Sequence, residues 1–307
     1  MHLSVYLPLL LSAVFGIAAP VLARRLPPAV ATWLLSLGGV VAAAGSAASL
    51  ALLGFTLIAQ SPELASRGHW SGATLRHANP VAVPIAAVAM AVLVLLAARA
   101  LTVSTRRLAA MRDAYRLAAL LPAPGGELVV IDSVDPQACA VPGRPGRIVV
   151  STGLLRGLDA GQRRAVLAHE RAHLTHRHHL HQTLALLACA ANPLLRRLPV
   201  AVELACERWA DEDAAATCRR DTVAEALTRA AAGARTLPGP AVVLAAAVAH
   251  VATRVGALRA PAPRLAWWRV TLLVGLLAAT AWAVLNAAHE TEQLLELAQY
   301  AYRAGYR

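Results

Sequence analysis

The sequence contains no lysine, so arginine supplies all of its permanently basic side chains. Charged residues make up only 15% of the 307 residues and hydrophobic residues make up 58%. Soluble domains, in contrast, are about 25% charged and about 45–50% apolar. This scarcity of charge argues against an ordinary soluble domain and indicates a protein that crosses a membrane several times.

Cysteine is also scarce, and its spacing excludes two kinds of site. The four cysteines are Cys139, Cys189, Cys206 and Cys218, and none of them forms a CxxC pair. A zinc ribbon or a thioredoxin-like redox site is therefore not expected. We expect four free thiols in a reducing compartment.

The first apolar run, residues 3–23, lacks the basic segment that begins a secretory signal peptide. The first arginines, Arg24 and Arg25, follow the run instead. A cleaved signal peptide is the alternative interpretation. The order of the charges favours a membrane-spanning helix whose N-terminus lies outside the cell, because arginine is enriched on the cytoplasmic side.

Three further apolar runs are long enough to cross a bilayer, which takes about 20 residues. With the first run, they predict a mainly α-helical, polytopic protein with transmembrane helices at about 3–23, 32–59, 81–101 and 265–288. Residues 1–101 then form a membrane region, and 61–80 an external loop. Residues 102–264 form a cytoplasmic α+β domain between helices 3 and 4, and residues 289–307 a short extracytoplasmic tail.

The net charge of +12 raises the alternative of a nucleic-acid-binding protein. With the predicted topology the outer segments sum to zero, so the whole excess of arginine lies on the cytoplasmic side. Membrane orientation alone produces such a bias. We expect contact with the lipid bilayer and no direct nucleic acid binding, and the location predicted is a bacterial inner membrane.

A histidine pair in the cytoplasmic domain is the strongest chemical signal. Asp159 and Gln162 form a capping-box pattern that begins a helix, and this helix carries His169, Glu170 and His173. Histidines four residues apart share one helical face, and the acid after the first completes the HExxH zinc-peptidase pattern. We expect the later histidines to be exposed or interfacial: His176, His178, His179 and His181.

A catalytic zinc ion needs a third protein ligand and an open position for water. Glu207 lies in a second helical segment, and Asp211 follows it by one turn on the same face. We predict Glu207 as the third ligand and Asp211 as the partner that hydrogen-bonds a histidine ligand. Glu203 shares this face and is the alternative ligand.

These residues predict a zincin-like peptidase domain in which Zn²⁺ activates a water molecule and Glu170 acts as the general base. Residues 127–132 and 147–151 are predicted strands. An extended peptide substrate could add to the 147–151 strand; the alternative is that this strand is already paired on both sides.

Four stretches resemble bacterial membrane metallopeptidases: residues 137–143, 147–155, 166–173 and 207–211. Two related families share these elements, the BlaR/MecR antirepressor peptidases and the HtpX and CAAX prenyl protease group. The order of three crossings, peptidase domain and fourth crossing resembles the BlaR/MecR family.

The resemblance implies that His169, His173 and Glu207 bind zinc and that Glu170 is the general base. Arg254 resembles an arginine that these peptidases carry late in the domain, with a structural or an oxyanion-stabilising role. The implied function is a membrane-bound zinc endopeptidase that cleaves a cytoplasmic protein such as a transcriptional repressor, with self-cleavage as a second implied reaction. The alternatives are an HtpX-like quality-control protease and a catalytically silent receptor or scaffold.

Overall fold

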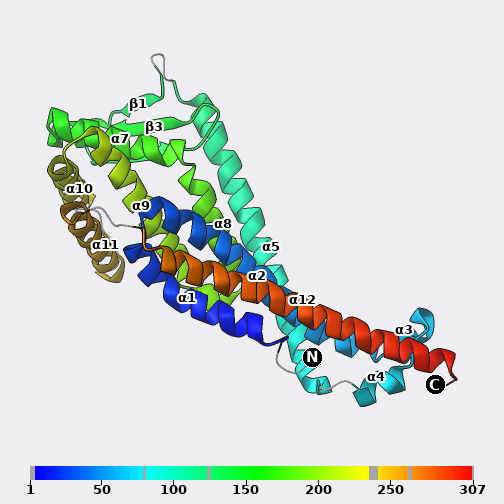
Figure 1. Cartoon of the computed structure of the whole chain (residues 1–307). Helices are drawn as coiled ribbons and strands as arrows, with labels where there is room; N and C mark the ends of the chain where they lie inside the picture. Colours follow the sequence, from blue (N-terminus) through cyan, green and yellow to red (C-terminus); the bar gives the residue numbers. More distant parts are fainter. Residues whose placement is uncertain (1–3, 79–80, 123–125, 235–240, 262–264, 306–307) are drawn as a thin grey trace.

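Four long helices form a bundle, with a small sheet and further helices at one end (Figure 1). The computed structural model describes residues 4–78, 81–122, 126–234, 241–261 and 265–305. The bundle helices are α1 (Leu7–Arg25), α2 (Pro28–Ala59), α5 (Val83–Leu120) and α12 (Trp267–Arg303). Two short helices, α3 (Pro62–Gly68) and α4 (Gly72–Ala78), lie at the far end from the sheet.

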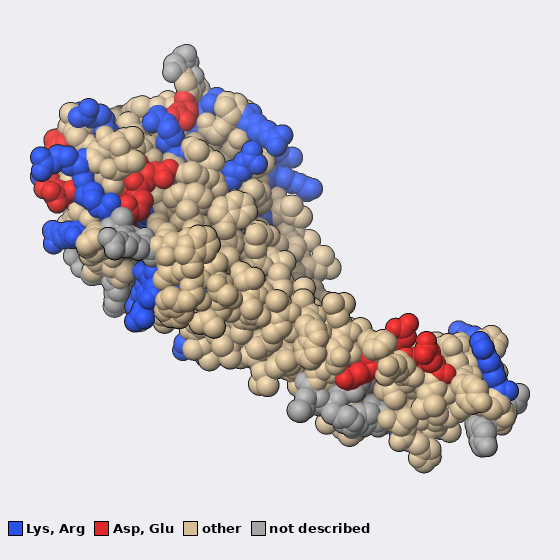
Figure 2. Space-filling view, in the orientation of Figure 1, with Lys and Arg blue, Asp and Glu red and all other residues tan. Residues whose placement is uncertain are grey.

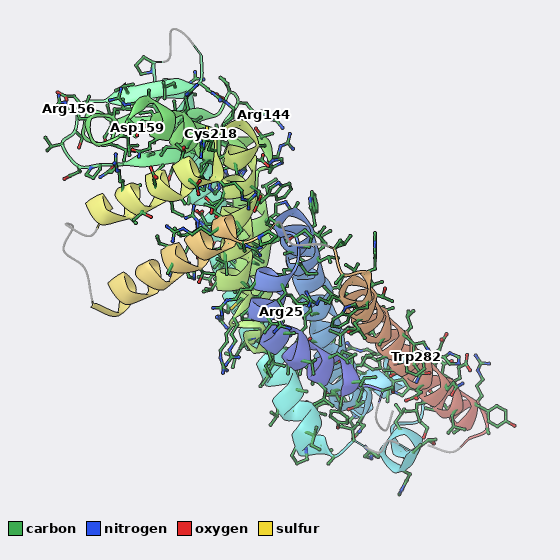
Figure 3. All side chains as sticks on the ribbon, turned by 60° about the vertical axis from the view of Figure 1, so that its left-hand side comes forward. Arg25, Arg144, Arg156, Asp159, Cys218 and Trp282 are labelled. Atoms are coloured by element: carbon green, nitrogen blue, oxygen red, sulfur yellow. The ribbon has the colours of Figure 1, made fainter. Side chains whose placement is uncertain are left out.

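Each bundle helix is long and apolar enough to cross a membrane, as predicted for four segments. Figure 2 shows charged side chains gathered at the two ends of the molecule, with a broad uncharged band between them. Figure 3 places Arg25 at the end of α1 and Trp282 on α12, and the Trp282 side chain is exposed. An uncharged outer band of this kind suits contact with lipid chains.

Two helices continue beyond their predicted ends. Helix α5 was expected to end near residue 101 and runs to Leu120, and α12 continues through the expected tail to Arg303. Neither extension contains proline or glycine, and alanine, leucine, arginine and glutamate all favour a helix. Hydropathy predicts where lipid contact ends, which need not be where a helix ends. The predicted loop at 61–80 contains α3 and α4.

The sheet has three strands, β1 (Leu128–Ile131), β2 (Ala138–Val141) and β3 (Arg147–Ser151), in the order β1-β3-β2. Strand β3 pairs in parallel with β1 and antiparallel with β2. Strands β1 and β3 confirm the two predictions, whereas β2 was not predicted. Because β3 is central, the hypothesis that a peptide adds to it is wrong, and the alternative of pairing on both sides is correct.

Helices α6 (Thr152–Gly157), α7 (Ala160–Thr175) and α8 (His178–Ala191) follow the sheet. The one-turn helix η1 (Pro193–Leu195) leads to α9 (Leu198–Thr217), α10 (Arg220–Ala234) and α11 (Ala241–Arg259). The capping box is confirmed: Asp159 Oδ1 accepts the Gln162 N–H at 2.9 Å, and Gln162 Oε1 accepts the Asp159 N–H at 3.3 Å. It fixes where the metal-site helix α7 begins.

The α8–η1–α9 hairpin packs into the membrane bundle. Asn192 Nδ2 donates to Ser46 Oγ at 2.8 Å, and Ser46 shares a 2.8 Å hydrogen bond with Ser12 of α1. At Gly16 the contact is so close that a Cβ atom would lie 2.3 Å from the Leu194 carbonyl oxygen. The hairpin thus connects the domain predicted for residues 102–264 to the membrane region predicted for residues 1–101. The other predicted boundary, residue 264, lies outside the described residues.

Candidate metal centre

Helix α7 presents two imidazoles on one face. His169 and His173 are separated by one helical turn, and their Nε2 atoms lie 3.1 Å apart. Both side chains are largely buried, with exposed fractions of 14% and 16%. Ala165 and Ala172 are buried, which fixes the rotation of the helix about its axis.

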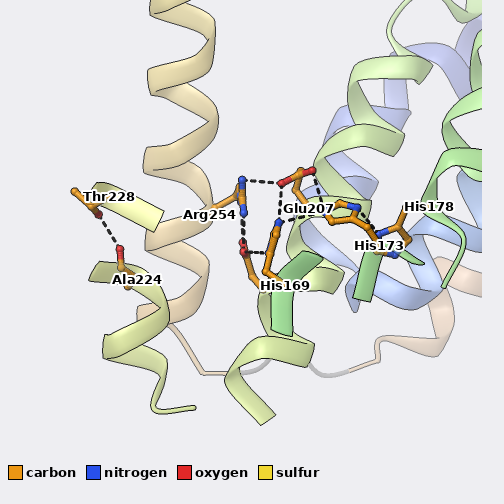
Figure 4. Close-up of polar contacts among 8 residues, drawn as sticks. His169, His173, His178, Glu207, Ala224, Thr228 and Arg254 are labelled. Carbon is orange, nitrogen blue, oxygen red and sulfur yellow. Dashed lines mark hydrogen bonds and ion pairs between the residues drawn. The ribbon is translucent and has the colours of Figure 1, made fainter. Parts of the chain in front are cut away.

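Helix α9 brings a carboxylate to the same point. Glu207 Oε2 lies 3.4 Å from His169 Nε2, and Glu207 Oε1 lies 3.4 Å from His173 Nε2 (Figure 4). Ligand atoms about 2.0–2.1 Å from a tetrahedral zinc ion lie about 3.3 Å from one another. The three donors thus have the chemistry and the mutual spacing of a zinc site. Among the described residues, they form the one group identified as able to hold a metal ion.

The outward-facing nitrogen of each histidine has its own partner. His169 Nδ1 lies 3.1 Å from Asp211 Oδ1, and His173 Nδ1 lies 2.9 Å from His178 Nδ1. With both Nδ1 atoms engaged, each ring directs its Nε2 atom to the common centre. Such partners set the orientation and the tautomer of a ligand histidine.

Arg254 of α11 joins the two carboxylates of α9. Its Nε and Nη2 donate to Asp211 at 2.8 and 2.7 Å, and its Nη1 lies 2.7 Å from Glu207 Oε2 (Figure 4). The side chain is only 11% exposed. A buried guanidinium in this position offsets the negative charge of two buried carboxylates and holds both in place.

Burial and charge act in opposite directions on the two imidazoles. Burial lowers the pKa of His169, but hydrogen bonds with Asp211 and Glu207 outweigh it and raise this pKa to about 9. Burial dominates at His173 and lowers its pKa to about 4. Burial raises the pKa of Glu207 and of Asp211, but hydrogen bonds and nearby cations outweigh it, so both carboxyls have lowered pKa values.

Glu170 lies beside the ligand cluster and faces strand β2. Its carboxylate accepts a hydrogen bond from the Ala140 backbone, and burial raises its pKa above the usual range for glutamate. A carboxyl group that is harder to ionise holds a proton more readily near neutral pH. That property suits a group that takes up a proton and passes it on.

A cavity of about 650 Å³ opens over these residues. One wall is strand β2 with the preceding Gln137, and the floor is α7 with His169, Glu170 and His173. The opposite wall is the apolar face of α10, with Val223, Ala226, Leu227 and Ala230. This cleft is large enough to receive several residues of an extended peptide.

The structure brings most of the predicted site residues together. His169, Glu170, His173, Glu207, Asp211 and Arg254 all line the cavity. Glu203, the alternative ligand, is exposed and lies outside the cluster, because one helical turn on α9 separates it from Glu207. Arg254 has a structural position between two carboxylates, which leaves little of its guanidinium for an oxyanion.

The prediction that the later histidines are exposed or interfacial is wrong for two of them. His178 is 1% exposed and His181 is 4% exposed. Arg177 adopts a left-handed conformation, with a φ of 51°, and this separates α7 from α8. Helix α8 therefore runs in a new direction, and its residues His178 and His181 face the interior. His181 Nδ1 contacts Ser36 Oγ of α2 at 2.9 Å. The spacing of five residues between His173 and His178 indicates that the two rings can lie close together. Their contact nevertheless depends on the turn at Arg177.

Metal binding should release about one proton per zinc ion at pH 6. His169, with a pKa of about 9, is protonated in the metal-free protein and must lose its proton to become a ligand, whereas His173 is already neutral. Zinc affinity should therefore rise with pH until the pH passes about 9. Calorimetry in buffers of different ionisation enthalpy measures the proton count. The same count in Glu170→Gln would exclude Glu170 as the source of the proton, and a count of zero in the wild-type protein would contradict its assignment to His169.

Part of the chain matches the sequence model of a known protein family. The sequence model of Peptidase family M48 matches residues 103–204, one third of the chain. The matched range contains the HExxH residues His169, Glu170 and His173 and ends before Glu207. No curated protein and no solved structure matches the chain. The match supports a metallopeptidase of the M48 group, which includes the HtpX and CAAX proteases. It does not support the narrower prediction of a BlaR/MecR-type peptidase.

Proposed function

We propose that the chain is a membrane-bound, zinc-dependent endopeptidase. One observation carries the proposal: two imidazole Nε2 atoms and a carboxylate converge within 4.8 Å of one another. They do so at the base of a cleft that also holds the buried carboxyl of Glu170. A catalytically silent receptor would have no need of this acid beside the ligand set.

His169, His173 and Glu207 would hold the zinc ion. Zinc bound there would polarise the scissile carbonyl and lower the pKa of a water molecule to about 7. Glu170 takes the proton from the attacking water and later gives it to the leaving amine. Asp211 orients the ring of His169, and Arg254 keeps Glu207 and Asp211 ionised and in place.

The peptide would bind along the free edge of β2. Ser151 donates its backbone N–H to the Gln137 carbonyl at 2.9 Å, so Gln137 faces β3. Because bonded and outward-facing residues alternate in an antiparallel pair, Ala138 and Ala140 turn their peptide groups to the cleft. The Ala140 N–H is used by Glu170, which leaves both polar groups of Ala138 for an added strand.

Replacing Ala138 by proline should lower kcat/KM about tenfold, because it removes one outward N–H and about 1.4 kcal/mol of binding. The sheet should remain intact, since that N–H does not bond to β3 and edge strands tolerate proline. Cleavage of a fluorogenic peptide by detergent-purified protein measures the effect, with zinc content determined in parallel. Val134→Ala changes an exposed residue before β2 that does not line the cavity, and this control should leave turnover unchanged. Normal turnover in Ala138→Pro would place the substrate elsewhere.

We propose that the natural substrate is a cytoplasmic regulatory protein, such as a transcriptional repressor, and that the enzyme could also cleave itself. The arginines at the inner ends of α1 and α12 support a cytoplasmic peptidase domain with both termini outside. Ser66→Cys in α3 and Arg156→Cys in α6 each introduce a cysteine at an exposed position. If the orientation is right, a membrane-impermeant thiol reagent added to intact cells should label Ser66→Cys and not Arg156→Cys. Labelling of Arg156→Cys alone by an impermeant reagent would contradict it.

One observation favours quality control of membrane proteins as the second candidate. Arg208, the neighbour of Glu207, donates hydrogen bonds to the carbonyl oxygens of Ala23 and Leu26 at the end of α1. These hydrogen bonds support a metal site at the depth of this helix end, which we infer to be near the membrane surface. Mapping of new protein N-termini in cells with and without the enzyme separates the candidates: cuts next to transmembrane segments favour quality control, and cuts in a soluble regulator favour the first.

A further inference from the structure

His178 is a buried histidine next to the candidate metal centre, and the predicted ligand set does not use it. It is the first residue of α8, and its Nδ1 lies 2.9 Å from His173 Nδ1 (Figure 4). The residue is 1% exposed. Its second nitrogen, Nε2, is also buried and has no hydrogen-bond partner among the described residues.

Two nitrogen atoms at this distance need one proton between them. His173 directs Nε2 at His169 and Glu207, so a metal ligand at that atom must keep its lone pair free. The proton of the neutral His173 ring then lies on Nδ1. His178 Nδ1 must in turn be an acceptor, which places the His178 proton on Nε2.

We propose that His178 is a positioning residue that accepts the His173 Nδ1 proton and so holds the His173 Nε2 lone pair toward the metal. This inference rests on the proposed zinc site and assigns a role to a residue outside its ligand set. His178 does for His173 what Asp211 does for His169, but with a neutral ring in place of a carboxylate.

The charges around the site explain why a neutral acceptor suits this position. Three carboxylates, Glu170, Glu207 and Asp211, already line the cavity, with Arg254 as the cation that contacts two of them. With a zinc dication these charges sum to zero. An ionised acid at position 178 would add a buried negative charge without a partner, which is costly.

Aromatic neighbours hold the His178 ring in this orientation. Trp209 of α9, two residues beyond Glu207, lies 5.3 Å from the His178 ring centre. His176 stacks on Trp209 with ring centres 4.1 Å apart, and its Nε2 lies 2.6 Å from Asp213 Oδ2. The His176 ring also stacks on the His178 ring, with ring centres 5.7 Å apart, so two aromatic neighbours restrict the His178 ring while its Nδ1 contacts His173.

Zinc affinity measured by competition with a chelator tests the proposal. His178→Phe keeps an aromatic ring against Trp209 and removes the acceptor, and it should weaken zinc binding about 10- to 100-fold. His178→Asn offers an amide oxygen close to the position of Nδ1 and should restore most of the affinity. His178→Leu is the second variant without an acceptor, should the phenylalanine prevent folding. His181→Leu, a buried histidine one turn later on α8 that contacts Ser36, is the matched control and should bind zinc normally.

The outcomes separate this inference from the proposed function. Wild-type affinity in a folded His178→Phe or His178→Leu variant would overturn the role of His178 while leaving the zinc site intact. Equal losses in His178→Asn and His178→Phe would show that ring packing, and not the acceptor, is what matters, and would also overturn it. Failure of the wild-type protein to bind zinc at all would instead remove the proposed function.

Discussion

Replacing Glu170 by glutamine should lower peptide turnover by about 10²- to 10⁴-fold, the range that general acid–base groups contribute. Glutamine keeps the size of the side chain but cannot take a proton from water. Because Glu170 is not among the three residues that converge on the metal position, the zinc content of the variant should equal that of the wild-type protein. The loss should therefore appear in kcat, with little change in KM.

The measurement is a steady-state assay in detergent, with zinc determined on the same samples. Glu203→Gln is the matched control, since Glu203 is an exposed glutamate outside the cluster, and its activity should be normal. Retention of more than a tenth of wild-type turnover by Glu170→Gln would mean that another group moves the proton. Loss of zinc from this variant would mean that Glu170 is needed for metal binding.

Replacing Arg254 by leucine should destabilise the metal-free protein by about 3–5 kcal/mol, as expected when one partner of a buried ion pair is removed. The substitution removes the guanidinium shared by two largely buried carboxylates, Glu207 and Asp211, and leaves protonated His169 as the cation in contact with both. It also frees the Glu207 side chain, which should weaken zinc binding. A bound zinc ion would in turn restore part of the lost stability, because it binds only the folded protein.

Thermal unfolding in detergent with a chelator present measures this effect, and the Tm should fall by about 10 °C. Arg259→Leu changes an exposed arginine on the same helix, α11, and should leave the Tm within a degree or two of the wild-type value. An unchanged Tm for Arg254→Leu would show that protonated His169 and solvent balance the two carboxylates without Arg254.

The sequence predicted the two halves of the site because helical periodicity places residues four apart on one face, whereas the meeting of α7 and α9 is a tertiary contact. His169 and His173 share a face whatever the rest of the fold, and Asp159 with Gln162 indicates where their helix begins. Glu207 and Asp211 follow the same rule on α9. The four apolar segments were predictable because a bilayer requires about 20 apolar residues for each crossing.

The other features depend on contacts between distant segments. Strand β2 contains two alanines and a cysteine, which have no strong strand preference, and it exists because β3 pairs with it. The contact of His178 with His173 depends on the turn at Arg177. The apolar part of the α8–η1–α9 hairpin was too short to be predicted as a membrane segment, yet it packs against Gly16 and Ser46.

The central claim, a zinc site with Glu207 as its third ligand, is tested most directly by zinc per chain in detergent-purified protein under mild chelation. We predict about one zinc ion in the wild-type protein and in Glu203→Ala, and a clear loss in Glu207→Ala. A wild-type protein that holds no zinc even after supplementation would contradict the account. The chain would then be better explained as a membrane receptor or scaffold.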